Sequence, residues 1–310
     1  MTAESVTDPT AEAIRRVQQV YGSWRRDTPV VQMREDWDRL FAVAPSDAET
    51  QSVLVDGMPS LWVATPGSER SRVLLYFHGG GYRLGSVRSH VDLMARIARA
   101  ARCRVLGVNY RLAPEHRFPA PVQDAVAAYE CLLAERVPAH CIALAGDSAG
   151  GGLAAAALLA LRDRARPLPA AAVMLSAWTD LTAQSDTYAT RAEADPIHQR
   201  TMILATARHY LGEQNEASHP LASPLFGDLA GLPPLLLQVG DRETVLGDST
   251  RFAKKARAAG VEVTLEVYPD MIHVFQQFAD LIPEAQQAID SIGCFLSRVW
   301  AQSPGAHASC

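Results

Sequence analysis

The chain has 310 residues, of which 48% are hydrophobic and 20% are charged, so it can bury the large core of a globular protein. Its formal net charge of −5 and pI near 6.0 exclude the basic surface expected of a nucleic-acid or anionic-membrane binder. The N-terminal stretch MTAESVTDPT has no signal-peptide pattern, and no apolar run is long enough to span a bilayer. We therefore expect a soluble, cytoplasmic protein.

Helical and strand patterns alternate along most of the chain. Residues 1–45 have apolar side chains at helical spacing, and then two β-type runs, QSVLV and SLWVA, flank a DGMP turn that predicts a hairpin. We expect further strands at 72–78, 103–109, 141–146, 171–177, 235–239 and 262–268, and helices near 88–101, 121–136, 149–165, 248–259 and 281–301.

This alternation predicts an α/β fold with a mostly parallel central sheet flanked by helices on both faces, the hairpin forming an antiparallel edge. Residues 184–222 break the rhythm, because they separate two strands by far more than one crossover helix. We expect residues 1–45 and this insertion to form the two parts of a helical cap, and residues 46–310 to form the catalytic domain apart from that insertion.

A Gly-x-Ser-x-Gly motif lies between a predicted strand and a predicted helix. Ser148 is flanked by Gly146 and Gly150, as expected of a nucleophile elbow, where glycines let neighbouring backbone approach a strained serine. The overlapping Gly150, Gly152 and Ala155 resemble a dinucleotide fingerprint, but they lie within the helix and after an interior strand. A dehydrogenase is therefore the weaker interpretation.

Two further motifs complete the pattern of a serine hydrolase. The glycine run after His78 can supply backbone N–H groups of Gly79 and Gly80 to an oxyanion hole, together with the N–H of Ala149. His273 follows the last predicted strand, where a histidine can take the serine proton and return it to the leaving group.

Five segments in order, FHGGGY, NYRLAPEHRFPAPVQD, GDSAGGG, GLPPLLLQVGD and YPDMIHVF, resemble the bacterial hormone-sensitive lipase family (family IV) of α/β-hydrolase carboxylesterases from about residue 70 to 300. The resemblance implies an α/β-hydrolase fold with a helical cap, and a serine carboxylesterase that needs no cofactor and no metal. It makes Ser148 the nucleophile, His273 the base, and Gly79, Gly80 and Ala149 the oxyanion hole.

The acid is where this chain departs from the family, whose members commonly have an Asp-Pro-Leu segment here. Counting along the family's motifs places the acid at Glu243, and glutamate can orient an imidazole as aspartate does. Asp241 lies closer to the strand end and remains the alternative acid. We expect Asp248 to cap the following helix.

The remaining candidates have less specific patterns. We expect Tyr82, Leu84 and Tyr188 to line the substrate pocket or pack the cap. We expect structural hydrogen bonds from Arg111, Glu115 and Asp180, of which Asp180 should lie nearest the site. His78 should shape the glycine loop, and five histidines are expected to be surface or packing residues: His116, His140, His198, His209 and His219.

The predicted function is hydrolysis of short- to medium-chain acyl esters of small molecules through an acyl-enzyme. A deacetylase or amide hydrolase acting on an acylated specialised metabolite is the alternative, since the motifs do not separate esters from amides. Plant gibberellin receptors resemble this family yet bind without catalysis, having lost the histidine that this chain retains as His273. Family members often dimerise, so the resemblance also implies a homodimer.

Overall fold

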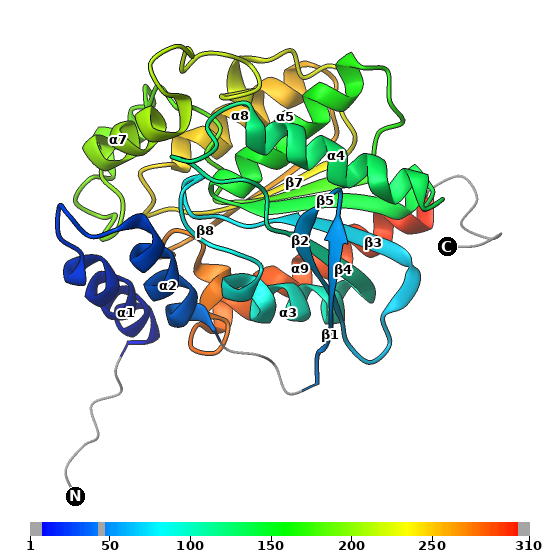
Figure 1. The fold of residues 1–310 in the computed structure, drawn as a ribbon, viewed down its shortest axis with the longest axis horizontal. Coiled ribbons are helices and arrows are strands. Elements are labelled where there is room, and N and C mark those ends of the chain that lie inside the picture. The colour runs from blue at the N-terminus through cyan, green and yellow to red at the C-terminus, as the bar shows by residue number, and fades with distance from the viewer. Residues whose placement is uncertain (1–7, 43–46, 303–310) are drawn as a thin grey trace, which may run out of the picture.

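A computed structural model describes residues 8–42 and 47–302 of the chain (Figure 1). One sheet runs through the molecule in the strand order β1-β2-β4-β3-β5-β6-β7-β8. Its strands are β1 (Glu49–Val55), β2 (Met58–Ala64), β3 (Glu69–Phe77), β4 (Cys103–Val108), β5 (Ile142–Asp147), β6 (Ala171–Leu175), β7 (Leu235–Gly240) and β8 (Val263–Tyr268).

The α-helices of the described ranges are α1 (Pro9–Ser23), α2 (Val30–Phe41), α3 (Val91–Ala101), α4 (Ala120–Ala134), α5 (Ala149–Asp163), α6 (Thr187–Thr190), α7 (Arg200–Leu211), α8 (Leu246–Ala258) and α9 (Pro283–Gln302). The predicted alternation is confirmed, and the element ends differ from the expected ones by a few residues, as is usual at frayed ends. None of these helices is long and apolar enough to cross a membrane.

The hairpin forms the antiparallel edge that its turn predicts. β1 pairs with β2, and β2 pairs with β4, both antiparallel, whereas all later neighbours are parallel. Asp56 and Gly57 have φ angles of 49° and 78°, and this positive-φ pair matches the right-handed twist of the two strands. The predicted α/β fold with a mostly parallel sheet is therefore confirmed.

Helices cover both faces of the sheet, as Figure 1 shows. One apolar cluster joins the sheet to α4, α5 and α8, and a second joins the opposite face to α3 and α9. The central strands β5 and β6 are buried along their whole length, because both of their faces are covered.

The N-terminal helices and the insertion lie at the same end of the sheet. In Figure 1, α1 and α2 are at the lower left, and α7 of the insertion lies above them. A third apolar cluster packs Ala13, Val17 and Phe41 of the N-terminal helices against Phe275 and Phe278, in the segment that follows β8. This end of the sheet is where β5 and β7 finish, so the helices lie over the ends of those strands.

The crossing of α3 and α9 provides a test of the packing. A Cβ atom on Gly293 would lie 2.4 Å from the backbone oxygen of Ala100, so Gly293→Ala should force the helices apart. We expect the free energy of unfolding to fall by about 1–3 kcal/mol, as overpacking does. The matched variant is Gly22→Ala in α1, where nothing lies within 4 Å. It should raise stability by up to about 1 kcal/mol. Equal denaturant midpoints for the two variants would contradict this account.

Candidate active site

Ser148 lies on a strained turn between β5 and α5. Its backbone has φ 52° and ψ −117°, a combination that non-glycine residues rarely adopt and that marks functional sites when neighbouring structure enforces it. The Ser148 N–H donates to the oxygen of Leu175 at 2.8 Å, and its own oxygen accepts from the Trp178 N–H at 2.9 Å. Backbone on both sides of the turn therefore holds the serine.

Close backbone contacts explain the glycines that flank the serine. A Cβ atom on Gly150 would lie 1.9 Å from the oxygen of Phe77, and one on Gly146 would lie 2.3 Å from the oxygen of Gly150. Any larger residue would separate β3, β5 and the start of α5. The backbone around Ser148 therefore has the geometry of the nucleophile elbow that the motif predicts.

Three side chains form a continuous hydrogen-bonded row. His273 Nε2 lies 2.8 Å from Ser148 Oγ, and His273 Nδ1 lies 2.7 Å from Glu243 Oε2. Asp241 takes no part in this row, because its carboxylate accepts from the Asp270 N–H at 2.8 Å. The structure thus brings Glu243, rather than Asp241, to the histidine.

The Glu243 carboxylate has a second set of partners, which the sequence analysis did not single out. Its Oε1 accepts from the Gly240 N–H at 2.5 Å and from the Ser176 hydroxyl at 2.7 Å. The same hydroxyl accepts from the Val274 N–H at 3.1 Å, directly after His273. Ser176 is fully buried and connects the loop of the acid with the loop of the histidine. Its place at the end of a predicted strand was the only available signal.

The charge of Glu243 governs the protonation of His273. Burial lowers the pKa of His273, but the nearby carboxylate of Glu243 and its hydrogen bond raise it, and Asp195 and Asp147 add to the rise. The net pKa lies above the ordinary histidine value, so the imidazolium form is stabilised. A histidine of this kind accepts a proton readily from a hydroxyl at hydrogen-bond distance.

The segment 194–198 of the insertion contacts the same row of side chains, a contact that no sequence pattern indicated. Asp195 Oδ2 accepts from the N–H and the hydroxyl of Thr244, at 2.8 and 3.1 Å, immediately beside Glu243. On the other side of Glu243, the Arg242 guanidinium donates to the Ala194 oxygen at 3.1 Å. The loop of the acid is therefore bonded to the insertion on both sides.

His198 was expected to be a surface or packing residue, but it lies against His273. The two rings are 4.2 Å apart between centroids, edge to face. Burial, followed by the nearby His273, lowers the pKa of His198 to about 3, so this ring stays neutral. No local pattern distinguished His198 from the other histidines, since 75 positions separate it from its partner along the chain.

The structure of the glycine loop after β3 differs from the prediction at one oxyanion donor, Gly79. The Gly79 N–H donates to Asp147 Oδ1 at 2.9 Å, so it is directed away from the space above Ser148. Gly80 and Gly81 line the cavity at Ser148, and their N–H groups have no partner among the described residues. The N–H of Ala149, at the first position of α5, is likewise unpaired. Gly81 therefore replaces Gly79 as a candidate donor.

A buried ion pair supports this loop from below. Asp147 also accepts from the Tyr76 hydroxyl at 2.8 Å and lies 3.2 Å from His90 Nε2. Burial raises the pKa of Asp147, but the charge of His90 and the hydrogen bonds from His90 and Tyr76 together hold it below its usual value. Burial and the charge of His90 lower the pKa of His78 to about 3, so His78 packs neutrally against Tyr110. His78 thus shapes the loop, as expected.

A cavity of about 310 Å³ opens above Ser148. Its walls come from the glycine loop, the N-terminal helices, the insertion and the residues around His273. Leu84 lines it as predicted, but Tyr82 and Tyr188 do not. Tyr82 is buried and stacks on Tyr210 at 3.8 Å, and Tyr188 donates its hydroxyl to Asp248 at 3.1 Å. Both tyrosines pack the insertion against the rest of the molecule.

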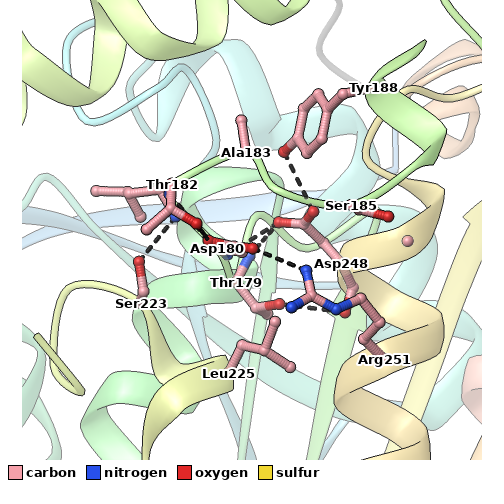
Figure 2. A network of polar contacts seen from close by, with 12 residues as sticks. Thr179, Asp180, Thr182, Ala183, Ser185, Tyr188, Ser223, Leu225, Asp248 and Arg251 are labelled. Atoms are coloured by element: carbon pink, nitrogen blue, oxygen red, sulfur yellow. Dashed lines mark hydrogen bonds and ion pairs between the residues drawn. The ribbon is translucent and has the colours of Figure 1, made fainter. Parts of the chain in front are cut away.

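Figure 2 shows the polar network that holds the start of the insertion. Asp248 accepts from the N–H groups of Thr179 and Asp180 at 3.0 and 2.9 Å, so it supports the turn after β6 instead of capping its own helix. Burial, together with the charge of Asp180, raises the pKa of Asp248 well above the usual carboxyl range. Asp180 in turn pairs with Arg251 at 2.8 Å, away from Ser148. Its predicted structural role is confirmed.

Two other predicted structural residues form ion pairs. Arg111 binds Asp124 at 2.7 Å, and Glu115 binds Arg34 of α2 at 2.7 Å. Arg34 also donates to the backbone oxygens of Arg83 and Ala113, both at 2.9 Å. These bonds hold α2 against the loops that follow β3 and β4.

A mostly parallel sheet with a serine elbow after β5, an acid after β7 and a histidine after β8 defines the α/β-hydrolase class. Comparison with known proteins agrees. A family model described as the α/β-hydrolase fold matches residues 74–277.

Relatives and solved structures identify the family within the α/β-hydrolase class. An acetyl-hydrolase of Streptomyces hygroscopicus is 41% identical over 298 residues, 94% of this chain and 97% of that protein. An esterase of Acinetobacter venetianus is 36% identical over 225 residues, 73% of this chain and 74% of its own. The crystal structure of an esterase from the bacterial hormone-sensitive lipase family is 46% identical, with a TM-score of 0.91, over 94% of this chain and 98% of that one. The chain belongs to this family of α/β-hydrolases, and the predicted resemblance is confirmed.

Ser176 supplies a test of how the row is held. Ser176→Ala removes the hydroxyl that Glu243 and the Val274 N–H share, so we expect kcat for an ester to fall about 10-fold through loss of hydrogen bonds to a charged group. The matched control is Ser249→Ala, because Ser249 is equally buried and its hydroxyl has no partner within residues 8–42 and 47–302. Equal kcat values for the two variants would show that Ser176 does not orient the row.

Proposed function

We propose that this carboxylic ester hydrolase works through Ser148, His273 and Glu243. Ser148 Oγ attacks the ester carbonyl while His273 Nε2 takes its proton, and Glu243 stabilises the resulting imidazolium. The same proton then goes to the leaving alcohol, which departs from the acyl-enzyme. Water repeats the cycle and releases the acid. The observation that carries the proposal is the unbroken row of 2.8 and 2.7 Å contacts at a strained serine.

The oxyanion of each tetrahedral intermediate would be bound by the N–H groups of Gly80, Gly81 and Ala149. Two features support this choice: the three groups have no other partner among the described residues, and Gly80 and Gly81 line the cavity at Ser148. Ala149 also opens α5, whose N-terminus carries positive partial charge toward the site. The Gly79 N–H, which is bonded to Asp147, would instead fix the loop.

The N-terminal helices and residues 184–222 would form the two parts of a cap. Both pieces contribute to the walls of the cavity above Ser148, which supports a shared role in enclosing the substrate. A cavity of about 310 Å³ suits short- to medium-chain acyl groups on a small molecule. The name of the Streptomyces relative, acetyl-hydrolase, favours acetyl as one such group.

The direct test is hydrolysis of p-nitrophenyl esters from acetyl to dodecanoyl. Wild type should prefer the short chains, and Ser148→Ala should lose about 10³-fold or more in kcat, as removal of a nucleophile does. Glu243→Gln should cost about 10²–10⁴-fold, because the imidazolium loses its charged partner. The matched control is Asp241→Asn, two residues away in the same loop. Its kcat should stay within about threefold of wild type. A larger loss for Asp241→Asn, or an inactive wild type, would overturn the proposal.

The pH dependence provides a second test. Asp195 raises the pKa of His273, so Asp195→Asn should lower that pKa. Activity requires neutral His273 in the free enzyme, and the acidic limb of kcat/KM should therefore move to lower pH, measured as initial rates across the limb. The matched control is Asp163→Asn, an exposed acid at the end of α5, which should leave the limb in place. A shift to higher pH in the Asp195 variant would contradict the assigned electrostatics.

A further inference from the structure

Arg83 is the one arginine or lysine among the described residues that line the cavity above Ser148. It lies in the glycine loop, where its N–H donates to the oxygen of Gly80 at 3.1 Å. Its backbone oxygen accepts from the Arg34 guanidinium of α2, so the backbone of Arg83 is held on two sides. The side chain therefore starts from a fixed position beside the candidate oxyanion donors.

The guanidinium of Arg83 has no partner. Within residues 8–42 and 47–302, no hydrogen bond or ion pair to it is present, and its Nε is buried without an acceptor. Three other partly buried arginines are paired: Arg34 with Glu115, Arg96 with Asp92 and Arg251 with Asp180. A buried donor without an acceptor costs free energy unless a ligand supplies one.

The charges around Arg83 leave a local excess of positive charge. Burial and then Arg34 lower the pKa of Arg83, while Glu115 raises it, so one acid faces two arginines. Glu115 is already bonded to Arg34 through both of its carboxylate oxygens. Burial lowers the pKa of His209 on α7, and the charges of Arg83, Arg117 and Arg208 lower it further. The sequence of α7, RTMILATARHYL, contains no acid that could offset these arginines.

The only carboxylate that lines the cavity is also accounted for. Among the described lining residues this is Asp147, which is bonded to Gly79, Tyr76 and His90 and balanced by the charge of His90. The wall that the N-terminal helices contribute is apolar and aromatic, with Tyr21 and Trp37 stacked at 5.5 Å. The cavity thus combines an apolar wall with a single unpaired cation.

We propose that Arg83 is a specificity-determining residue that binds a carboxylate on the substrate, so that the preferred esters carry one anionic group on an otherwise apolar body. A guanidinium presents a planar pair of donors that match a carboxylate, and partial burial strengthens the bond. This inference rests on the proposed esterase function of the same site and adds the chemical class of its substrate.

The experiment compares each carboxylate-bearing ester with its methyl ester, in which methylation removes the charge and adds one methyl group. One pair is mono-p-nitrophenyl succinate and its methyl ester, with the charge on the acyl side; the other is 4-acetoxybenzoate and its methyl ester, with the charge on the alcohol side. Wild type should show a higher kcat/KM for the carboxylate member of at least one pair. Arg83→Leu and Arg83→Gln should lower that ratio about 10- to 100-fold, the size expected of a charge-assisted hydrogen bond.

The matched control is Arg88→Leu, because Arg88 is an exposed arginine of the same region and does not line this cavity. It should leave the ratio within about twofold. The inference is overturned if wild type prefers the methyl ester in both pairs, or if the variants at 83 and 88 change the ratio equally. Hydrolysis of p-nitrophenyl acetate separates the two proposals. Activity there without a preference for carboxylates rejects only the role of Arg83, whereas inactivity on every ester rejects the esterase function itself.

Discussion

The close approach of Phe77 and Gly150 is the constraint on which the site depends. The backbone oxygen of Phe77, at the end of β3, occupies the space where any side chain at position 150 would begin. Because β3 and β5 are neighbours in the sheet, the serine turn and the glycine loop leave it side by side. The strained φ of Ser148 and the unpaired N–H groups of Gly80 and Gly81, among the described residues, thus lie on either side of one tight packing contact.

The other half of the site depends on the ends of β6, β7 and β8. Each strand ends in a loop that contributes one group, Ser176, Glu243 and His273 in turn, and parallel strands bring these ends to one edge of the sheet. The two oxygens of Glu243 have different partners. One contacts the imidazole, and the other accepts hydrogen bonds from a buried hydroxyl and a backbone N–H. Fully bonded carboxylates of this kind keep one orientation, which a histidine partner needs.

Local patterns were sufficient to predict the fold. They also indicated Ser148, His273 and Glu243, with Asp241 left open as the acid, and the structure brings the first three together in one hydrogen-bonded row. They could not choose between Gly79 and Gly81 as oxyanion donor. That choice depends on the direction of the Asp147 carboxylate, which captures one N–H and leaves the others free. His198 packs, as one of its two expected roles allowed, but its position against His273 comes from a ring contact across the fold that no local pattern indicated. For Tyr82 and Tyr188 both lining of the pocket and packing of the cap were left open, because aromatic residues near an active site suit either role, and in the structure both pack.

The two pieces over the cavity are held by different forces. The segment 194–198 is bonded to Arg242 through the Ala194 oxygen and to Thr244 through Asp195, whose buried carboxylate would lose its two bonds to Thr244 if the segment moved away. Each lost hydrogen bond to a charged group costs about 1.5–3 kcal/mol. On the other side, α2 depends on Arg34, whose partner Glu115 is 45% exposed and contributes correspondingly less. The insertion therefore holds the loop of the acid through hydrogen bonds, whereas the N-terminal helices pack an apolar face against Phe275 and Phe278, in the segment that follows His273.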